Sequence, residues 1–170
     1  MRMRLREIGP EGRTFDWRPD AEEARALADE LGLLALSKAR LVGEARAAAG
    51  GWELRARLGA TARQPCAITL APVATRVEEE VVRRYGAAPP APPGETEMAA
   101  DADEWEDAPE TLDLAAVFAE ALSLALPAFP RAEGAELGET IAGPPGTAPM
   151  TDDDAKPLAG LKALRDRMGD

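Results

Sequence analysis

The sequence predicts an α+β fold in which an antiparallel sheet of about four to six strands packs against two or three helices. Apolar or small side chains alternate with mostly charged ones over residues 1–9 and again over 33–63, as expected for strands with one buried face. Residues 20–32 and 111–127 instead repeat apolar side chains every three to four positions, which is typical of amphipathic helices. This order of strands and helices indicates one mixed core.

Short local signals mark the first strand and the first helix. Residues 1–9 alternate apolar side chains with three arginines, which predicts a strand. Asp20 followed three residues later by Glu23 predicts a capping box at a helix start. Gly32 stands where a helix C-terminal cap is expected.

Residues 33–63 predict a β-hairpin that turns at Gly50-Gly51, because this dipeptide suits the positive φ of tight hairpin turns. That register pairs apolar or small side chains on one face and places Arg46 opposite Arg55 on the other. The second face collects the charged residues Lys38, Arg40, Glu44, Arg46, Glu53, Arg55, Arg57 and Arg63. We interpret this face as the best candidate for binding, with merely solvated side chains as the alternative.

The second half of the chain continues with a strand, a loop and a helix. Residues 73–85 fit strand or helix spacing, and their β-branched side chains favour a strand. Residues 86–110 combine clustered prolines with acidic side chains, which predicts a mobile, disordered loop. In the next helix Thr111 is the expected cap, Asp113 lies in the first turn and Pro127 ends it.

Missing residue types exclude several kinds of site. The 170 residues contain no His and one Cys, Cys66, so neither a zinc site of Cys and His ligands nor an intrachain disulfide can form. A Ser-His or Cys-His nucleophile pair is excluded as well. We expect a protein that binds rather than catalyses, without cofactor or metal. The acidic runs at 78–80 and 152–154 are interpreted as solvated charge or a helix cap.

The net charge of −11 is unevenly distributed. Residues 1–85 hold 15 Lys and Arg against 13 Asp and Glu, whereas residues 86–170 hold 5 against 18. An acidic chain disfavours nonspecific nucleic-acid binding, although a local basic face remains compatible with it. No apolar run suits a membrane span or a signal peptide, so we expect a cytoplasmic monomer without a membrane partner.

The chain length suits one domain with appendages. We expect this α+β domain at residues 1–135, with the acidic loop at 86–110 inside it. Residues 136–155 have the composition of a linker, and residues 156–170 predict a short amphipathic helix.

Four motifs resemble those of the YceD family in order and spacing. They are Q-x-C-x-x-T-L-x-P-V at 64–73, L-D-L at 112–114, L-x-L-P at 124–127 and K-P-L-x-x-L-x-x-L at 156–164. The residues that carry the first three motifs include Gln64, Cys66, Thr69, Leu70, Pro72, Asp113, Leu114, Leu126 and Pro127. Gly51-Trp52 and the preceding Ala-Glu-Glu-Ala helix resemble the alphaproteobacterial branch.

The resemblance implies a non-enzymatic role in the synthesis, processing or stability of large-subunit (23S) ribosomal RNA, by binding the RNA or a ribosome-assembly protein. The alternative is a protein-only adaptor that holds a basic ribosomal protein or assembly factor through its acidic half. Many relatives carry Cys-x-x-Cys clusters near the turn. Here Thr69 stands three residues after Cys66, so a metal-linked role does not extend to this chain.

The candidate residues for RNA or partner binding are Lys38, Arg40, Arg46, Arg55, Arg57, Arg63 and Trp105. Trp105 lies in the acidic loop, where an aromatic side chain suits either a binding motif or loop packing. No base or thiolate-stabilising pair accompanies Cys66, so we interpret it as a buried structural residue. Asp113 is expected to start a helix rather than contact a partner.

Overall fold

The computed structural model describes residues 1–48, 50–87 and 105–138. The chain divides into two compact units, Met1–Glu133 and Gly134–Asp170, and all the helices and strands named below lie in the first. The predicted C-terminal helix, nearly all of the linker and most of the acidic loop lie outside the described residues. The domain limits given above therefore stay predictions.

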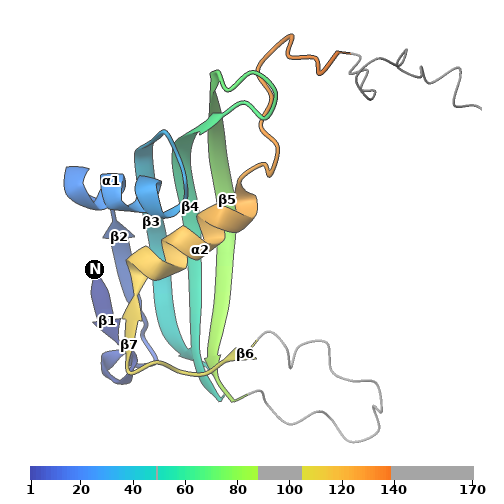
Figure 1. Cartoon of the computed structure of the whole chain (residues 1–170). Coiled ribbons are helices and arrows are strands. Elements are labelled where there is room, and N and C mark those ends of the chain that lie inside the picture. The colour runs from blue at the N-terminus through green and yellow to red at the C-terminus, as the bar shows by residue number, and fades with distance from the viewer. Residues whose placement is uncertain (49, 88–104, 139–170) are drawn as a thin grey trace, which may run out of the picture. The chain divides into compact units, whose positions relative to one another are not determined.

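The described chain forms seven strands, two α-helices and one 3₁₀ turn, and the α+β prediction is confirmed. In chain order these are β1 (Arg2–Arg4), η1 (Leu5–Glu7), β2 (Arg13–Trp17), α1 (Ala21–Glu30), β3 (Ala35–Ala48), β4 (Gly51–Pro65), β5 (Pro72–Gly86), β6 (Trp105–Glu106), β7 (Thr111–Asp113) and α2 (Leu114–Ala125). The main sheet has the order β2-β3-β4-β5-β6, and β1 pairs with β7 (Figure 1). All pairs are antiparallel except β5 with β6.

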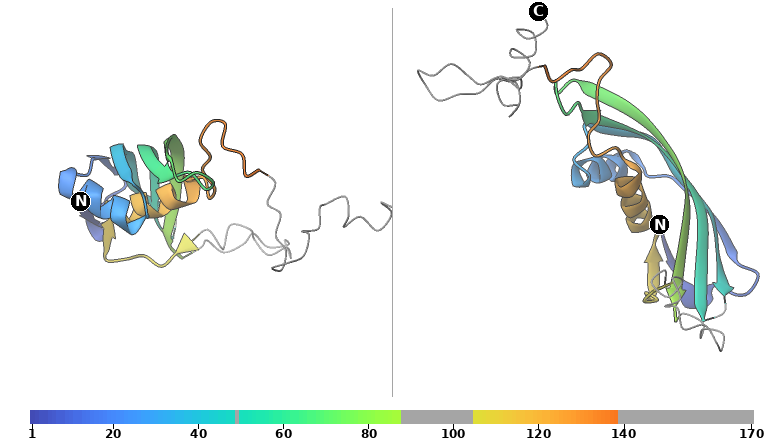
Figure 2. Two further views of the ribbon diagram at one scale, coloured as in Figure 1. Left: turned by 45° about the horizontal axis from the view of Figure 1, so that its top comes forward. Right: turned by 90° about the vertical axis from the view of Figure 1, so that its right-hand side faces the viewer.

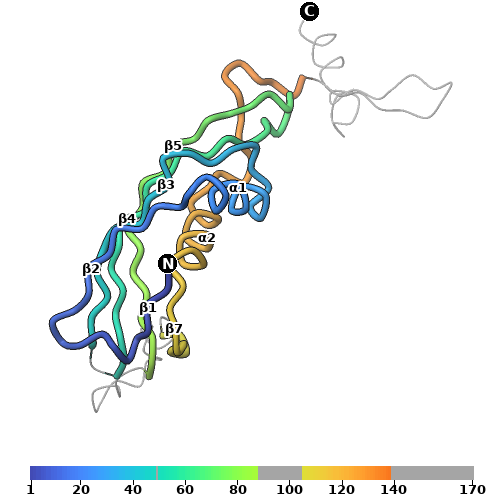
Figure 3. Tube along the Cα trace, turned by 90° about the vertical axis from the view of Figure 1, so that its left-hand side faces the viewer, coloured from blue at the N-terminus to red at the C-terminus, as the bar shows by residue number. Residues whose placement is uncertain are grey.

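The long strands β3, β4 and β5 form a curved sheet, and both helices lie on the same face of it (Figure 2). The β1–β7 pair lies on this side as well, with the N-terminus next to the start of α2 (Figure 3). The backbone N–H of Leu114 donates to the carbonyl oxygen of Met1 at 3.1 Å, which fixes this end of the chain. The opposite face of β3–β5 has no helix over it within the described residues.

Both helices begin at aspartates. The predicted capping box of α1 is confirmed: Asp20 Oδ1 accepts from the N–H of Glu23 at 2.8 Å, and Glu23 Oε2 accepts from the N–H of Asp20 at 3.1 Å. The predicted cap at Thr111 is wrong, because residues 111–113 form β7. Asp113 caps α2 instead, and its carboxylate accepts from the N–H of Ala115 at 3.1 Å.

The core lies between the helices and the inner face of the sheet. Leu41, Leu54 and Leu58 are completely buried there, as the predicted alternation requires. Phe118 of α2 meets Trp17 of β2 edge to face, with ring centroids 5.3 Å apart. β2 was not predicted, although its apolar side chains Phe15 and Trp17 alternate with polar ones in a short run.

The predicted hairpin is present, but its predicted register is wrong by two residues. Ala48 pairs with Gly51, so the turn lies one residue earlier than expected and Gly51 belongs to β4. A Cβ atom on Gly51 would lie 1.8 Å from the carbonyl oxygen of Tyr85, so this glycine allows β5 to approach. From Arg40 onward, a two-residue shift keeps side chains on their predicted faces but changes their cross-strand partners, whereas the irregularity between Ser37 and Arg40 takes Lys38 out of the regular pairing.

Two other predicted elements differ in extent. The opening strand covers only Arg2–Arg4 and gives way to the 3₁₀ turn η1, although Met3 and Leu5 are buried as expected. At the ends of the predicted acidic loop, Gly86 belongs to β5 and residues 105–106 form β6.

Candidate functional site

Arginines dominate the outer face of the main sheet, which faces away from both helices. Because side chains alternate along each strand, the register of β3, β4 and β5 places seven arginines on this face. They are Arg40, Arg46, Arg55, Arg57, Arg63, Arg76 and Arg84. Five carboxylates share the face: Asp16, Glu44, Glu53, Glu78 and Glu80. The face therefore carries an excess of positive charge in a chain whose net charge is −11.

Glu53 lies at the centre of this arrangement and is only 7% exposed. Its Oε1 atom accepts from Arg55 Nε at 2.7 Å and from Arg46 Nη2 at 2.8 Å. Arg55 Nη2 lies 3.3 Å from Oε2, and Arg84 Nε lies 3.7 Å from the same oxygen. Hydrogen bonds from Arg55 and then Arg46 hold the pKa of Glu53 at about 2. We call these four residues the Glu53 cluster.

One carboxylate in the Glu53 cluster thus orients three guanidinium groups from three adjacent strands. A guanidinium has five N–H donors, and Glu53 engages only one or two of those on Arg46 and Arg55. The side chains of Arg46 and Arg55 are 47% and 56% exposed, so both reach the solvent. The cluster has a net positive charge and fixed donors, a combination suited to binding an anion.

A shallow hollow of about 440 Å³ adjoins the Glu53 cluster on the outer face. Its lining includes Val42, Arg55, Arg57, Glu80 and Val82. Val42 lies directly opposite Arg57 and Val82 opposite Arg55, so apolar side chains separate the charged ones. The hollow therefore presents a small apolar surface bordered by guanidinium groups.

The remaining arginines of the face differ in how firmly they are paired. Arg40 binds Asp16 through two hydrogen bonds of 2.7 and 2.8 Å, and this interaction lowers the pKa of Asp16. Arg57 lies 3.6 Å from Glu80, and both side chains are largely exposed. For Arg63, no carboxylate lies within 4.0 Å among the described residues.

The predicted basic face exists, but one predicted contact is wrong. Arg46 does not face Arg55: it pairs across the strands with Glu53, and Arg55 pairs with Glu44. The expected repulsion between two arginines is therefore replaced by attraction between opposite charges. Arg76 and Arg84 were both missed, although their even spacing along β5 places them on the same face.

Two further predicted site residues, Lys38 and Trp105, lie outside the regular pairing of the three long strands. Lys38 occupies an irregularity of β3 between Ser37 and Arg40, where its φ is +52°. Trp105 lies in β6 opposite Arg84 and is half-buried. Trp105 is therefore the strand neighbour of a member of the Glu53 cluster, whereas Lys38 lies near the other end of β3.

Cys66 directly follows the last residue of β4, at the end of that strand away from Glu53, and is completely buried. Its Sγ atom accepts from the backbone N–H groups of Ile68 and Thr69 at 3.4 Å and of Ala132 at 3.3 Å. The side chain of Thr69 and then these backbone donors lower the pKa of the thiol to about 6. The sulfur therefore organises a turn and has no access to solvent, in agreement with a structural role.

The family-type motifs meet around this turn. Gln64 Nε2 donates to the carbonyl oxygen of Pro127 at 3.3 Å, and the N–H of Ala67 donates to the carbonyl oxygen of Pro130 at 2.8 Å. Leu126 ends α2, Pro72 begins β5, and Leu70 is exposed at a φ of +60°. The turn is thereby attached to the chain that leaves α2.

The second motif, at 112–114, fixes the start of α2. The Asp113 carboxylate caps the helix and binds Arg2 Nε at 3.0 Å, and Leu114 is completely buried. This agrees with the expected role of Asp113 at a helix start. The hydrogen bonds of Gln64, Cys66 and Asp113 therefore join parts of the same chain and stabilise the fold.

Within the described residues, no three Cys, Asp or Glu side chains lie close enough together to hold a metal ion. None of the helices in this part of the chain is long and apolar enough to cross a bilayer.

A model of the family described as "Large ribosomal RNA subunit accumulation protein YceD" matches residues 54–165. The matched segment begins in β4 and includes the Cys66 turn, β5 and α2. No curated protein and no solved structure matches the chain.

Proposed function

Because the chain belongs to the YceD family of large ribosomal RNA subunit accumulation proteins, we propose that it acts by binding this RNA directly through the outer face of its sheet. The family connects the chain with ribosome biogenesis and the 23S RNA. The proposed role is non-enzymatic and cytoplasmic, and supports synthesis, processing or stability of the RNA. The Glu53 cluster is the observation that supports this proposal best.

The Glu53 cluster suits a phosphate backbone for three physical reasons. Guanidinium groups bind phosphate oxygens through paired hydrogen bonds, which an ammonium group cannot reproduce. Glu53 already holds the arginines in place, so less side-chain entropy is lost when an anion binds. Three cations around one carboxylate leave a net positive site for the phosphate.

The adjoining hollow adds contacts for a base. Single-stranded RNA exposes bases that stack on guanidinium planes or lie against apolar side chains. Val42 and Val82 supply such a surface between Arg55 and Arg57. The acidic remainder of the chain disfavours RNA that contacts other faces, so binding is confined to this one.

The decisive experiment removes charge from the outer face without disturbing Glu53. Arg57 and Arg63 are exposed, and both are replaced by Gln. The matched control replaces Arg4 and Arg25, which lie in β1 and α1 on the helix side of the sheet, by Gln. Affinity for labelled fragments of large-subunit RNA is measured over a series of salt concentrations.

We expect the outer-face variant to bind more weakly and its slope of log affinity against log salt to flatten by up to about two units, because two phosphate contacts are lost. The control variant should retain the parental slope. Equal behaviour of the two variants would contradict direct RNA binding and favour the protein-only adaptor.

A charge-conserving variant tests whether the geometry of the cluster matters. Replacing Arg46 and Arg55 by Lys keeps both charges but removes the paired donors. We expect weaker RNA binding with little change in the salt slope, since the number of cations is the same. Unchanged affinity would show that the face acts only as diffuse charge.

A further inference from the structure

Most of strand β5 forms an open edge of the main sheet within the described residues. β6 contributes only two residues and pairs with Arg84 and Tyr85 at the end of β5. Along the rest of β5, residues 72–83, no described strand lies on the side away from β4. Unpaired N–H and C=O groups on such an edge can accept an additional strand.

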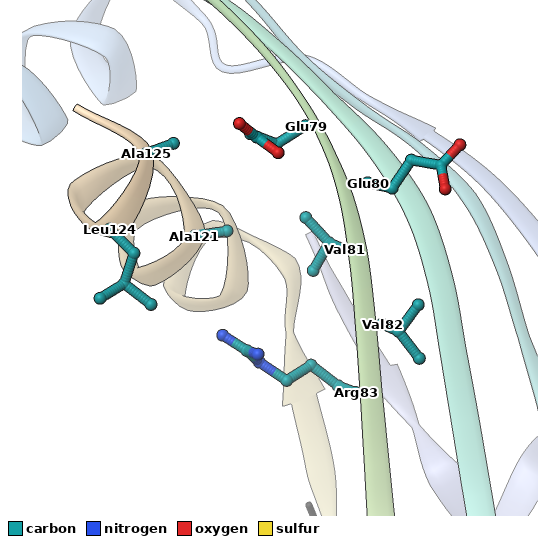
Figure 4. A pocket seen from close by; sticks show the side chains of 8 residues that line it. All are labelled: Glu79, Glu80, Val81, Val82, Arg83, Ala121, Leu124 and Ala125. Atoms are coloured by element: carbon teal, nitrogen blue, oxygen red, sulfur yellow. The ribbon is translucent and has the colours of Figure 1, made fainter. Parts of the chain in front are cut away.

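A groove of about 470 Å³ runs along this edge, between β5 and the C-terminal half of α2 (Figure 4). Val81 of β5 and Ala121 and Ala125 of α2 provide its apolar lining. Leu124 also lines it and is 76% exposed, an unusual exposure for a large apolar side chain on a helix. A strand placed beside β5 would cover these side chains.

The charges along the open edge specify the kind of strand that fits. Glu78, Glu79 and Glu80 are consecutive and exposed. Arg83 is already bound by two carboxylates, with Glu120 at 2.8 Å and Glu106 at 3.4 Å. Arg76 also lies on this stretch and binds Glu78 at 2.9 Å. Five carboxylates (Glu78, Glu79, Glu80, Glu106 and Glu120) still outnumber the two arginines, so a basic strand is electrostatically complementary to the edge.

A second copy of the chain fits this edge poorly. Two β5 edges paired antiparallel about Glu79 would place Glu78 of one copy opposite Glu80 of the other. Like charges directly opposite each other destabilise a strand pair. The three glutamates therefore disfavour self-association while leaving the edge open to a basic sequence.

From these observations we infer that the edge of β5 binds an extended, basic peptide segment of a partner protein as an added strand. Side chains of such a strand alternate between the two faces of the sheet. Apolar side chains on the helix side enter the groove beside Val81 and Leu124. Lys or Arg on the outer side lie beside Glu78 and Glu80. This site is separate from the Glu53 cluster and does not depend on RNA binding.

The test uses the full chain and a synthetic eight-residue peptide that alternates lysine and valine, with both ends blocked. A second peptide has the same composition but groups its lysines and valines in two blocks. Binding is followed by fluorescence anisotropy, and the contacted residues by the NMR shifts of backbone amides. We expect the alternating peptide to bind and to shift amides of residues 76–83 and of the C-terminal half of α2, and the block peptide to bind less.

Variants at the β5 edge, each with a control elsewhere on the surface, distinguish binding at this edge from nonspecific attraction to exposed charge or apolar side chains. Glu78→Lys with Glu80→Lys, and separately Leu124→Lys, should each weaken peptide binding by about tenfold or more. The control for charge replaces the exposed Glu11 and Glu30 by Lys. The control for the loss of an exposed apolar side chain is Leu70→Lys, because Leu70 is 75% exposed in the Cys66 turn. Both controls should bind the peptide as the parental chain does.

Three results would overturn the inference. The first is no binding of the alternating peptide, and the second is an equal loss in the control variants. The third is a shift of residues 76–83 with protein concentration alone, which would identify a second copy as the occupant. RNA affinity, measured in parallel, should not change in Leu124→Lys, because Leu124 lines the groove beside α2 and not the hollow beside the Glu53 cluster, so the two sites are tested independently.

Discussion

The inner and outer faces of the main sheet come from the same strands but remove side chains from water by different means. On the inner face, which faces the helices, Leu54 and Leu58 are completely buried. On the outer face, no described helix covers β4, and yet Glu53 is only 7% exposed. Its cover consists of Arg46, Arg55 and Arg84.

This difference separates what determines the fold from what we propose for binding. Burial on the inner face depends on apolar volume, which stabilises the fold in proportion to the area removed from water. On the outer face, one carboxylate determines where three cationic groups lie. Substitutions on the two faces should therefore change different measurements.

The largest effect is expected from Leu114→Asp, on the helix that covers the inner face. Leu114 is completely buried, and an unpaired carboxylate at that position should lower the free energy of unfolding by about 3 kcal/mol or more. The control is Leu124→Asp in the same helix, where 76% exposure should limit the loss to about 0.5 kcal/mol. Urea denaturation measures both, and similar losses would place Leu114 outside the core.

An intermediate effect is expected from Glu53→Gln on the outer face. The amide loses the charge that attracts the three arginines, and the free energy of unfolding should fall by about 1–3 kcal/mol. Glu44→Gln removes an exposed carboxylate from the same face and should cost less. RNA affinity should fall in Glu53→Gln if the carboxylate positions the arginines, and unchanged affinity would contradict that role.

The same residue predicts a dependence of stability on pH. Arg55 and then Arg46 depress the pKa of Glu53 from its ordinary value of 4.5 to about 2. A depressed pKa in the folded state adds stability that is complete above pH 4.5 and is lost as the pH falls through about 2. The stability difference between the parental chain and Glu53→Gln should therefore narrow over this interval. A constant difference would contradict the ion pairs of the cluster.

The faces of the sheet were predictable from the sequence, because alternation depends only on whether positions are odd or even. The basic residues from Arg40 to Arg63 and the buried leucines of β4 lie where that rule places them. The capping box of α1 was predictable for a similar reason: its signal lies within four residues.

Cross-strand partners were not predictable in the same way. Gly50 lies in the turn in both the predicted and the observed register, but Gly51 belongs to β4, where it lies against the backbone of Tyr85 in β5. That contact is absent from the local pattern of the hairpin, so the predicted register paired Arg46 with the wrong residue. The open edge of β5 likewise depends on which strands pair in space.

The thiol of Cys66 is the closest contrast to Glu53, because it is also a buried acidic group. Its donors are one side chain and three backbone N–H groups, all of them neutral. Attachment of the turn to Ala132 spans 66 positions of sequence, which is why no local motif indicated it. The Glu53 carboxylate thus orients arginine side chains at the surface, whereas the Cys66 sulfur accepts hydrogen bonds from backbone N–H groups and stabilises a turn.

The smallest effect is expected from Thr69→Val, which tests this contrast. Valine matches threonine closely in size but lacks the hydroxyl that contributes most to lowering the thiol pKa, so the pKa should rise from about 6 toward 9.0. A depressed thiol pKa adds stability that is complete above pH 9.0 and is lost as the pH falls through about 6. Between these values the stability of the parental chain should therefore rise more steeply with pH than that of the variant. Ultraviolet absorbance of the thiolate and urea denaturation measure the two quantities, and coinciding profiles would show that the hydroxyl does not bind the sulfur.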